Sequence, residues 1–424
     1  MSRFIKRYLF CYLLWLRFLG FRFGVVDGSI GWTGITYLEL FRMMLLKRVV
    51  LLQMQDVIDW FPFDEVVDLP DGFLSYDSVL YGVCDELQMQ PWEIDEKDPE
   101  HRSIALKYYH EYVLYEHQLG KLDKHVRPSF FVYCQGYMTG AYVCRRFAIC
   151  FDIPFLALEN TSDETRLLWE NVSGVSVNRT LARNYFWRMQ DICSEEQVMG
   201  YCRDKIRNIR SNKLEEHVSG EALLGARNRP FLLYLGQVYT DTSLLFSSLR
   251  ELTPEVVVQA LSKQADELGM DLVVKLHPKE DGSNSSMAKV PYDRLSYRKL
   301  LSVLSNEELV RVIIDYDNRF DTYQLIQDAS LVVTINSQAG LEGALFGKPV
   351  VTCGYGNYTD LGFTYECTNP EELRESVNAG LCRSSAKAQE DYRLACFYDY
   401  IYFQHYCVKK TANELLRLIC TKCL

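Results

Sequence analysis

The residues best suited to bind an anion lie where an apolar run ends in a small polar turn. Residues 331–335 (LVVTI) are apolar and β-branched, which is typical of a buried parallel strand. Asn336 and Ser337 follow this run, and the pattern then predicts a helix that begins at Gln338 and stops at Gly347. Free backbone N–H groups and the helix dipole make a helix N-terminus attractive to a negative charge. The sequence therefore predicts a phosphate site at this turn.

Two more predicted strands, at residues 230–235 and 272–276, end in polar side chains. The residues at or after these ends that could contact the same ligand are Gln237, Asp241, Lys275, His277 and Lys279. Because strands of one parallel sheet place their carboxyl ends on one edge, these groups should converge on the turn at 336–337. A lone histidine is more often structural, but a cationic or donor imidazole at that edge, beside two lysines, would neutralise phosphate charge.

A second set of candidates lies in the first half of the chain. The pattern predicts a strand at 129–135, a helix at 138–150 and a strand at 155–158, a βαβ unit whose right-handed crossover implies a parallel sheet. The polar residues at the two carboxyl ends are Gln135, Gly136, Glu159 and Asn160. Glu159 directly follows four apolar residues, so it either faces the ligand crevice or caps the following turn.

The alternation of predicted strands and helices indicates an α/β protein with two Rossmann-like domains on parallel sheets. The first domain is predicted at residues 1–225, and its last part, 178–225, reads as a charged helical connector. The second is predicted at 226–385. Helices at 386–424 are expected to pack back towards the first domain.

Length, composition and charge exclude several classes of protein. A chain of 424 residues with 48% hydrophobic and 24% charged residues has the size of two globular domains and the composition of an ordered protein. A net charge of −10 argues against a general nucleic-acid binder. The 14 cysteines are scattered, which indicates reduced thiols in a cytosolic protein. The sequence lacks P-loop, dinucleotide and paired-CxxC signatures, and nothing in it indicates a metal site.

The first 50 residues are basic, with eight lysines and arginines against two acidic residues. Residues 8–16 are apolar, but Arg17 ends the run, so it is shorter than the roughly 20 apolar residues that a bilayer span needs. Two interpretations are open. The segment could form a helix in the membrane interface, or a helix packed on the first domain with solvated basic ends.

Taken in order, these residues resemble the capsule polysaccharide biosynthesis family of glycosyltransferases, especially the bacterial retaining β-Kdo transferases. The resemblance covers about residues 129–380, and the first 125 residues add nothing to it. The residues that carry it are Gln135, Gly136, Glu159, Asn160, Gln237, Asp241, His277, Pro278, Ser337, Gly340, Glu342, Gly347, Lys348, Pro349, Tyr358 and Gly362. Thr161 stands where the family pattern would have glycine, which affects the expected acceptor geometry.

The resemblance implies a GT-B fold, in which the acceptor-side first domain and the nucleotide-binding second domain face a central cleft. It also implies CMP-Kdo as the donor, with no metal or other cofactor. Asp241 would form a covalent glycosyl adduct, and Glu159 would be the other essential carboxylate. The residues implied on the donor side are Gln237, Lys275, His277, Lys279, Asn336, Ser337, Gln338, Gly340 and Glu342, with His277 and Ser337 on the phosphate and Glu342 near the ribose. Those implied on the acceptor side or in the cleft are Gln135, Gly136, Asn160 and Tyr358.

The chemistry of such a reaction agrees with these residue types. A CMP leaving group is already stabilised, so the site must mainly neutralise the departing phosphate and place a carboxylate against the oxocarbenium-like carbon. A second carboxylate from the opposite domain can act as base for the acceptor hydroxyl.

The predicted function is retaining transfer of Kdo from CMP-Kdo to a lipid-linked, lipopolysaccharide or capsule glycan. The predicted location is the cytosolic face of the inner membrane, with peripheral contact through residues 1–50 and no nucleic-acid partner. One alternative is an inverting GT-B enzyme that uses CMP-sialic acid or another nucleotide sugar. Another is a non-catalytic GT-B-like subunit for glycan assembly, against which the joint presence of Glu159, Asp241 and His277 argues.

Overall fold

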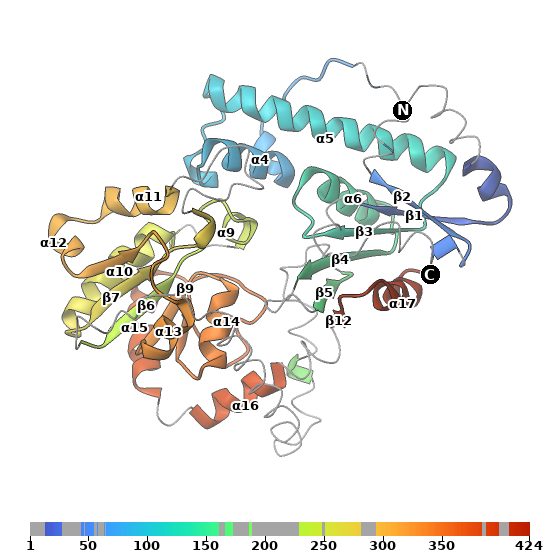
Figure 1. Cartoon of the computed structure of the whole chain (residues 1–424). Coiled ribbons are helices and arrows are strands. Elements are labelled where there is room, and N and C mark those ends of the chain that lie inside the picture. Colours follow the sequence, from blue (N-terminus) through green and yellow to red (C-terminus); the bar gives the residue numbers. More distant parts are fainter. Residues whose placement is uncertain are drawn as a thin grey trace. The chain divides into compact units, whose positions relative to one another are not determined.

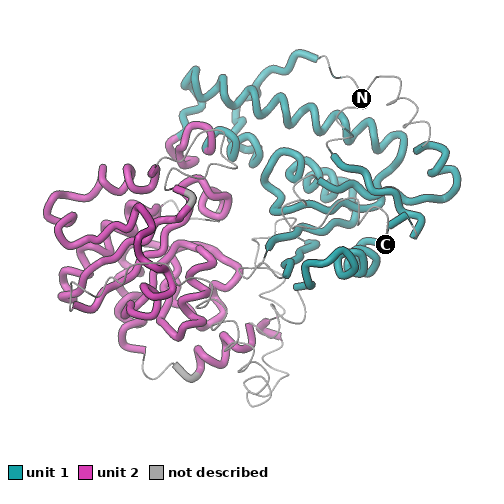
Figure 2. Tube along the Cα trace, viewed as in Figure 1, with its two compact units in different colours: residues 1–84, 94–181, 402–424 teal, residues 85–93, 182–401 magenta. Residues whose placement is uncertain are grey.

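The computed structural model divides the chain into two compact units (Figures 1 and 2). Unit 1 contains Met1–Cys84, Ile94–Leu181 and Tyr402–Leu424, and unit 2 contains Asp85–Glu93 and Ala182–Ile401. The structure describes residues 13–27, 44–45, 47–54, 57, 63, 65–160, 166–172, 186–188, 229–247, 251–280, 294–383, 387–397 and 407–424. Most of the predicted connector at 178–225 lies outside these ranges.

Unit 1 is built on a six-stranded sheet with the order β12-β5-β4-β3-β1-β2. The strands are β1 (Arg22–Val26), β2 (Val49–Gln53), β3 (Phe130–Cys134), β4 (Phe155–Asn160), β5 (Arg166–Glu170) and β12 (Cys407–Lys409). Strands β1 to β4 pair in parallel, and β3, α6 (Thr139–Cys150) and β4 form the predicted βαβ unit. Strand β5 is antiparallel to both β4 and β12.

The carboxyl end of β4 differs from the prediction. The strand continues through Glu159 and Asn160, which pair with Leu168 and Leu167 of β5. The predicted end of this strand at residue 158 is therefore two residues too early. The physical reason is that the apolar strand β5 supplies a hydrogen-bonding edge, which extends β4 beyond its apolar run.

Two hydrophobic layers cover the unit 1 sheet, one on each face (Figure 1). The face with Val25, Tyr133 and Ala157 packs on α5 (Pro99–His125) and α6. The opposite face packs on α17 (Ala412–Lys422). This alternation follows from the two-residue period of a strand.

The start of helix α5 is set by a capping side chain and a proline. The Asp98 side chain accepts hydrogen bonds from the N–H groups of Glu100 and His101, and Pro99 occupies the first helical turn. The highly charged stretch 93–102 (EIDEKDPEHR) thus includes the start of a long helix. Between residues 65 and 98 the structure contains α4 (Asp77–Leu87) and the short 3-10 helices Phe73–Ser75 and Pro91–Glu93.

Unit 2 is built on a six-stranded parallel sheet with the order β11-β10-β9-β6-β7-β8. The strands are β6 (Phe231–Leu235), β7 (Asp271–Lys275), β8 (Val312–Asp315), β9 (Leu331–Thr334), β10 (Val350–Thr352) and β11 (Tyr365–Glu366). The chain runs outward from β6 to β8 and then returns to the other side of β6 at β9. The topological switch point, where ligands of such sheets bind, therefore lies between β6 and β9.

The sequence periodicity predicts helices at 254–268, 296–304, 322–328 and 371–379, and the structure contains each of them within two residues of these bounds. Helices cover both faces of the unit 2 sheet. They are α9 (Thr242–Ser247), α10 (Pro254–Glu267), α11 (Leu295–Val303), α12 (Asn306–Leu309), α13 (Thr322–Asp328), α14 (Gln338–Leu345), α15 (Pro370–Leu381) and α16 (Lys387–Phe397), with a 3-10 helix at Pro278–Glu280. Helices α10, α11 and α15 share one core with the sheet, while α14 packs on β9 and β10. Together with unit 1, this confirms the predicted mixed α/β class with parallel-dominated sheets.

The units differ in extent from the predicted domains. Residues 85–93 join unit 2, although they precede most of the strands of unit 1. The C-terminal region is divided, because α16 belongs to unit 2 and α17 to unit 1. Strand β12 explains this division, since it extends the unit 1 sheet next to β5.

The described part of the N-terminal segment has both a packed and an exposed side. Residues 13–18 are helical, and Leu13 and Leu16 lie in the core of unit 1. Trp15 and Phe18 are 55% and 87% exposed. Among the described residues, no helix combines the length and the apolar character needed to cross a bilayer.

Candidate functional site

The two strand ends at the switch point are joined by a side-chain network. Gln237 follows β6, and its Oε1 accepts a hydrogen bond of 3.2 Å from the backbone N–H of Asn336, which follows β9. The Nε2 of Gln237 donates to the Ser243 hydroxyl at 2.7 Å. The Nδ2 of Asn336 donates to the carbonyls of Ser243 at 2.8 Å and Tyr355 at 3.2 Å. The predicted convergence of Gln237 and Asn336 is present in this geometry.

Asp241 belongs to the same network. Its Oδ1 accepts hydrogen bonds from the backbone N–H of Ser243 at 2.8 Å and from the Ser243 hydroxyl at 2.6 Å. These bonds begin helix α9, so Asp241 acts as an N-cap. Among the described residues, nothing donates to its Oδ2. Ser243 is a site residue that sequence reasoning missed, although a serine two positions after an aspartate is the usual partner in such a turn.

The predicted anion site at the N-terminus of α14 has the expected local structure. Ser337 is the N-cap residue, and its hydroxyl accepts a hydrogen bond from Ala339 N–H at 3.3 Å. The first turn of α14 contains no acidic side chain. Gln338 begins the helix, and Glu342 is buried in its second turn.

Gly340 and Tyr358 pack against this turn. A Cβ atom on Gly340 would lie 2.7 Å from the Cγ2 of Thr334 and would also collide with the hydroxyl of Tyr358. The Tyr358 hydroxyl donates to the carbonyl of Ser337. Tyr358 is only 1% exposed, and burial raises the pKa of its phenol. Tyr358 therefore holds the turn in place, whereas the prediction assigned it to the acceptor side or the cleft.

The three predicted cationic residues at the end of β7 have different environments. The Lys275 ammonium is buried and lies 2.6 Å from Asp315 Oδ2, and it donates to the carbonyl of Phe320 at 2.9 Å. It is therefore engaged in a buried ion pair, which tethers the end of β7 to the turn after β8. His277 follows β7 and is partly exposed. Lys279 lies in the next turn, and its side chain falls outside the described part of the structure.

Glu280 is a second residue that sequence reasoning missed. This carboxylate is buried and accepts hydrogen bonds from Tyr239 N–H at 2.8 Å, Ser296 N–H at 2.9 Å and the Ser296 hydroxyl at 2.9 Å. Burial raises its pKa, and the hydrogen bonds from Ser296 and Tyr239 oppose that rise. Glu280 thus anchors the loop that leads from β6 to Asp241.

In unit 1, the turn after β3 has an unusual backbone. Gln135 and Gly136 have φ angles of 59° and 98°, so two successive residues occupy the left-handed region. This conformation costs about 1–2 kcal/mol at Gln135, because its Cβ atom crowds the backbone there. Strained residues of this kind cluster at functional sites, which is consistent with the prediction for this turn.

Glu159 and Asn160 face opposite sides of the unit 1 sheet, because adjacent strand residues alternate. Glu159 shares its face with Ala157, the face covered by α5 and α6, while Asn160 lies on the face covered by α17. Asp27, at the end of β1, is a further buried carboxylate that sequence reasoning missed. A side chain on Gly140, at the start of α6, would collide with the Asp27 carboxylate.

One family model matches the central part of the chain. Residues 188–392 match the family described as capsule polysaccharide biosynthesis protein. The predicted resemblance is confirmed. The matched range of the capsule polysaccharide family contains every candidate of unit 2 from Gln237 to Tyr358. It does not include the unit 1 candidates, which precede residue 188.

The chain is also similar to individual proteins of capsule assembly. It is 28% identical over 173 residues to the capsule polysaccharide export protein KpsS of Escherichia coli. This match spans 40% of the chain and 40% of the length of that relative.

Two solved structures from Thermosulfurimonas dismutans are similar at low identity. The KpsC β-Kdo 2,4 transferase matches with a TM-score of 0.45 at 18% identity, over 67% of this chain and 82% of the other. The KpsC β-Kdo 2,7 transferase matches with a TM-score of 0.43 at 15% identity, over 72% and 89%.

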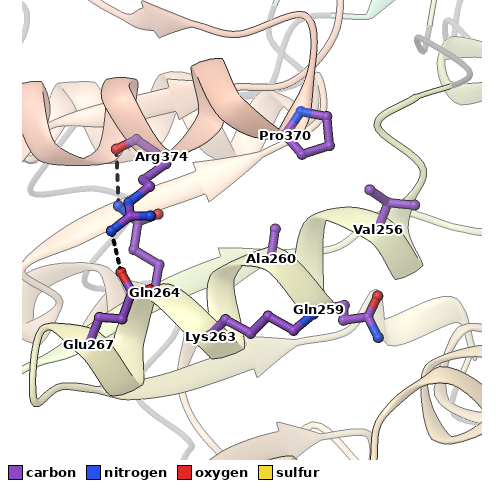
Figure 3. A pocket seen from close by; sticks show the side chains of 8 residues that line it. All are labelled: Val256, Gln259, Ala260, Lys263, Gln264, Glu267, Pro370 and Arg374. Carbon is purple, nitrogen blue, oxygen red and sulfur yellow. Dashed lines mark hydrogen bonds and ion pairs between the residues drawn. The ribbon is translucent and has the colours of Figure 1, made fainter.

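A surface cavity of about 340 Å³ lies between α10 and α15, away from the switch point (Figure 3). Its lining includes Lys263, Gln264 and Arg374. The side chain of Gln264 donates to the carbonyl of Arg374 and ties the two helices together. Within the described ranges, no group of three or more His, Cys, Asp or Glu side chains is placed to hold a metal ion.

Proposed function

We propose that this protein is a glycosyltransferase of capsule polysaccharide biosynthesis that transfers Kdo from CMP-Kdo with retention. The observation that carries the proposal is the network at the switch point of unit 2. It holds Asp241, Gln237 and Asn336 together next to the N-terminus of α14. The family match over residues 188–392 supports the same assignment.

The donor phosphate would bind at the N-terminus of α14. Ser337 caps this helix, and the helix dipole stabilises an anion at its N-terminus. His277 would add a donor or a cation from the end of β7. We propose that these groups neutralise the leaving phosphate without a metal ion, because CMP is already a stabilised leaving group.

Asp241 would act as the nucleophile through Oδ2. In the first step, this oxygen attacks the anomeric carbon of Kdo, and the bond from that carbon to the phosphate oxygen breaks, so CMP leaves with the electron pair. In the second step, the acceptor hydroxyl attacks the same carbon and releases Asp241 while Glu159 takes the hydroxyl proton. Two displacements at one carbon give net retention. The hydrogen bonds to Oδ1 would hold the carboxylate in place during both steps.

The proposal includes a GT-B fold, with Glu159 and Asp241 as its two catalytic carboxylates. It also includes a glycan or glycolipid acceptor at the cytosolic face of the inner membrane. The exposed Trp15 and Phe18 support a peripheral membrane contact, because aromatic side chains favour the bilayer interface.

The replacement of Asp241 by asparagine tests the nucleophile. Asparagine is as good an N-cap as aspartate, so Asp241→Asn retains the start of α9 while removing the charged oxygen. Transfer of Kdo from CMP-Kdo should fall by a factor of about 1,000 or more, and CMP affinity should stay within a few-fold of the wild type. Turnover is measured by release of CMP, and affinity by calorimetry. Full activity in this variant would contradict the proposal.

The capping role of Asp241 favours one alternative, an inverting transferase that uses CMP-sialic acid or another nucleotide sugar. In that case Asp241 would only begin α9, and Glu159 alone would act as base. Intact-mass spectrometry after incubation with CMP-Kdo separates the two mechanisms. A mass increase of one Kdo residue, absent in Asp241→Asn, supports the nucleophile. An active enzyme that never gains this mass supports the inverting alternative.

A further inference from the structure

The loop that carries Asp241 is held by a segment from a distant part of the sequence. Residues Asp85–Glu93, which contain the end of α4 and the 3-10 helix Pro91–Glu93, belong to unit 2. They contact the residues that immediately precede Asp241. Nothing in their sequence pattern indicates a role in the site.

Two buried hydrogen bonds, one to a backbone carbonyl and one to a side chain, hold this loop. The Nε2 of Gln90 donates to the carbonyl of Tyr239 at 2.5 Å, and Gln90 is 1% exposed. The hydroxyl of Thr240 donates to Asp85 Oδ1 at 3.1 Å, and both side chains are buried. Two consecutive residues before Asp241 are therefore held from the same side.

The Tyr239 side chain is fixed as well. Its hydroxyl donates to Glu255 at 2.7 Å, and the Lys299 ammonium lies 5.2 Å from the centre of its ring. Glu93, at the end of the same segment, lies 2.7 Å from that ammonium. The N–H of Tyr239 is bonded to Glu280, so Tyr239 is held through both its backbone and its ring.

We infer that Asp85–Glu93 is a positioning segment for Asp241, with Gln90 and Asp85 as its positioning residues. The inference rests on the proposed function, because it assigns the nucleophile to Asp241. The bonds to Tyr239 and Thr240 set the direction in which the chain enters Asp241, and Asp241 N–H then bonds to the carbonyl of Val238 at 2.9 Å. A misplacement of about 1 Å at a reacting atom can cost about 100-fold in rate, so release of this loop should lower kcat.

Gln264, which lines the cavity between α10 and α15, provides a matched control for Gln90 (Figure 3). Gln264 is 5% exposed, and its Nε2 donates to the carbonyl of Arg374 at 3.0 Å, so it is a buried glutamine that holds a backbone carbonyl of the same unit. Gln90→Ala and Gln264→Ala should lower the melting temperature to a similar extent. Only Gln90→Ala should reduce kcat, by about tenfold or more, with the KM for CMP-Kdo nearly unchanged.

The hydroxyl of Thr240 provides a second test that preserves the shape of the side chain. Thr240→Val removes the bond to Asp85, whereas Thr240→Ser retains it. We expect Thr240→Val to lower kcat and Thr240→Ser to restore it to within a few-fold of the wild type. A purely structural role would change the melting temperature without this recovery of kcat.

Hydrogen–deuterium exchange separates this inference from the proposed function. The amides of residues 236–244 should exchange faster in Gln90→Ala than in Gln264→Ala, whichever donor the enzyme uses. Faster exchange in a protein that does not turn over CMP-Kdo would support the positioning segment and contradict the proposed donor. If Gln90→Ala matches Gln264→Ala in both loop exchange and kcat, the inference is overturned.

Discussion

At the scale of single residues, the two carboxylate oxygens of Asp241 have different hydrogen-bonding environments. Oδ1 accepts the hydrogen bonds that begin α9, and among the described residues Oδ2 accepts none. The side chain is thus oriented by its own helix before any ligand arrives. A carboxylate that is fixed in this way needs little further ordering when it reacts.

Glu280 gives a prediction with a defined pH dependence. Its pKa is raised in the folded protein by burial, so the folded state binds its proton more tightly than the unfolded state does. Stability therefore falls as pH rises from the ordinary carboxyl pKa towards the raised one. Glu280→Gln lacks this titration, and it also replaces an acceptor of the Ser296 bonds with a donor. The stability penalty of Glu280→Gln should be largest near pH 4.5 and smaller at neutral pH.

Denaturant unfolding of both proteins at several pH values measures this difference. Arg298 lies near Glu280 and lowers its pKa, so the titration should move further upward in Arg298→Ala. A penalty that grows with pH would show that the folded state favours the charged carboxylate.

Local sequence patterns predicted the strand ends but not all of the partners. The polar residues after β6, β7 and β9 were visible because each follows an apolar run. The partner of Lys275 was not, because Asp315 lies 40 positions further along the chain. The same limit applies to Glu280, whose buried position depends on contacts with Tyr239 and Ser296.

At the scale of elements, α14 can approach β9 only because Gly340 lacks a side chain. In Gly340→Ala, the new Cβ would meet Thr334 at 2.7 Å and would also press on Tyr358. The crowding should lower the free energy of unfolding by about 1–3 kcal/mol and shift the N-terminus of the helix. We therefore expect weaker binding of CMP, which calorimetry can measure.

Gly356→Ala is the control for this prediction. Its Cβ would have only ordinary contacts, the nearest at 3.5 Å from Tyr358. Stability and CMP affinity should change little in this variant. Equal effects in the two variants would argue against close packing as the reason for Gly340.

Two short strands were not predicted from the sequence, for different reasons. Strand β12 joins the unit 1 sheet over a long distance in sequence, from the C-terminal end of the chain, and β11 is only two residues long. Neither carries a pattern of its own that separates it from a loop. Long helices and buried strands such as α10 and β6 were predicted well, because their apolar periodicity is local.

At the scale of the whole molecule, residues 13–18 would carry the membrane contact that we propose. Trp15 and Phe18 are exposed, while Leu13 and Leu16 hold the helix to the core. The double variant Trp15→Ser/Phe18→Ser should bind anionic phospholipid vesicles several-fold more weakly than the wild type.

Phe151→Ser is a suitable control, because Phe151 is an exposed aromatic residue at the end of α6 in the same unit. Binding is measured by co-sedimentation at several salt concentrations. Unchanged binding in the double variant, or an equal loss in the control, would contradict a specific contact through residues 13–18.

The bond between Gln237 and Asn336 also constrains how the protein folds. These residues are 99 positions apart, and the strands β7 and β8 are formed by the chain between them. Closing so long a loop is slow, since its entropy must be lost before the contact stabilises anything. A nascent chain that has emerged only as far as β8 therefore lacks the bond that joins the two strand ends at the switch point, and with it the donor site that we propose there.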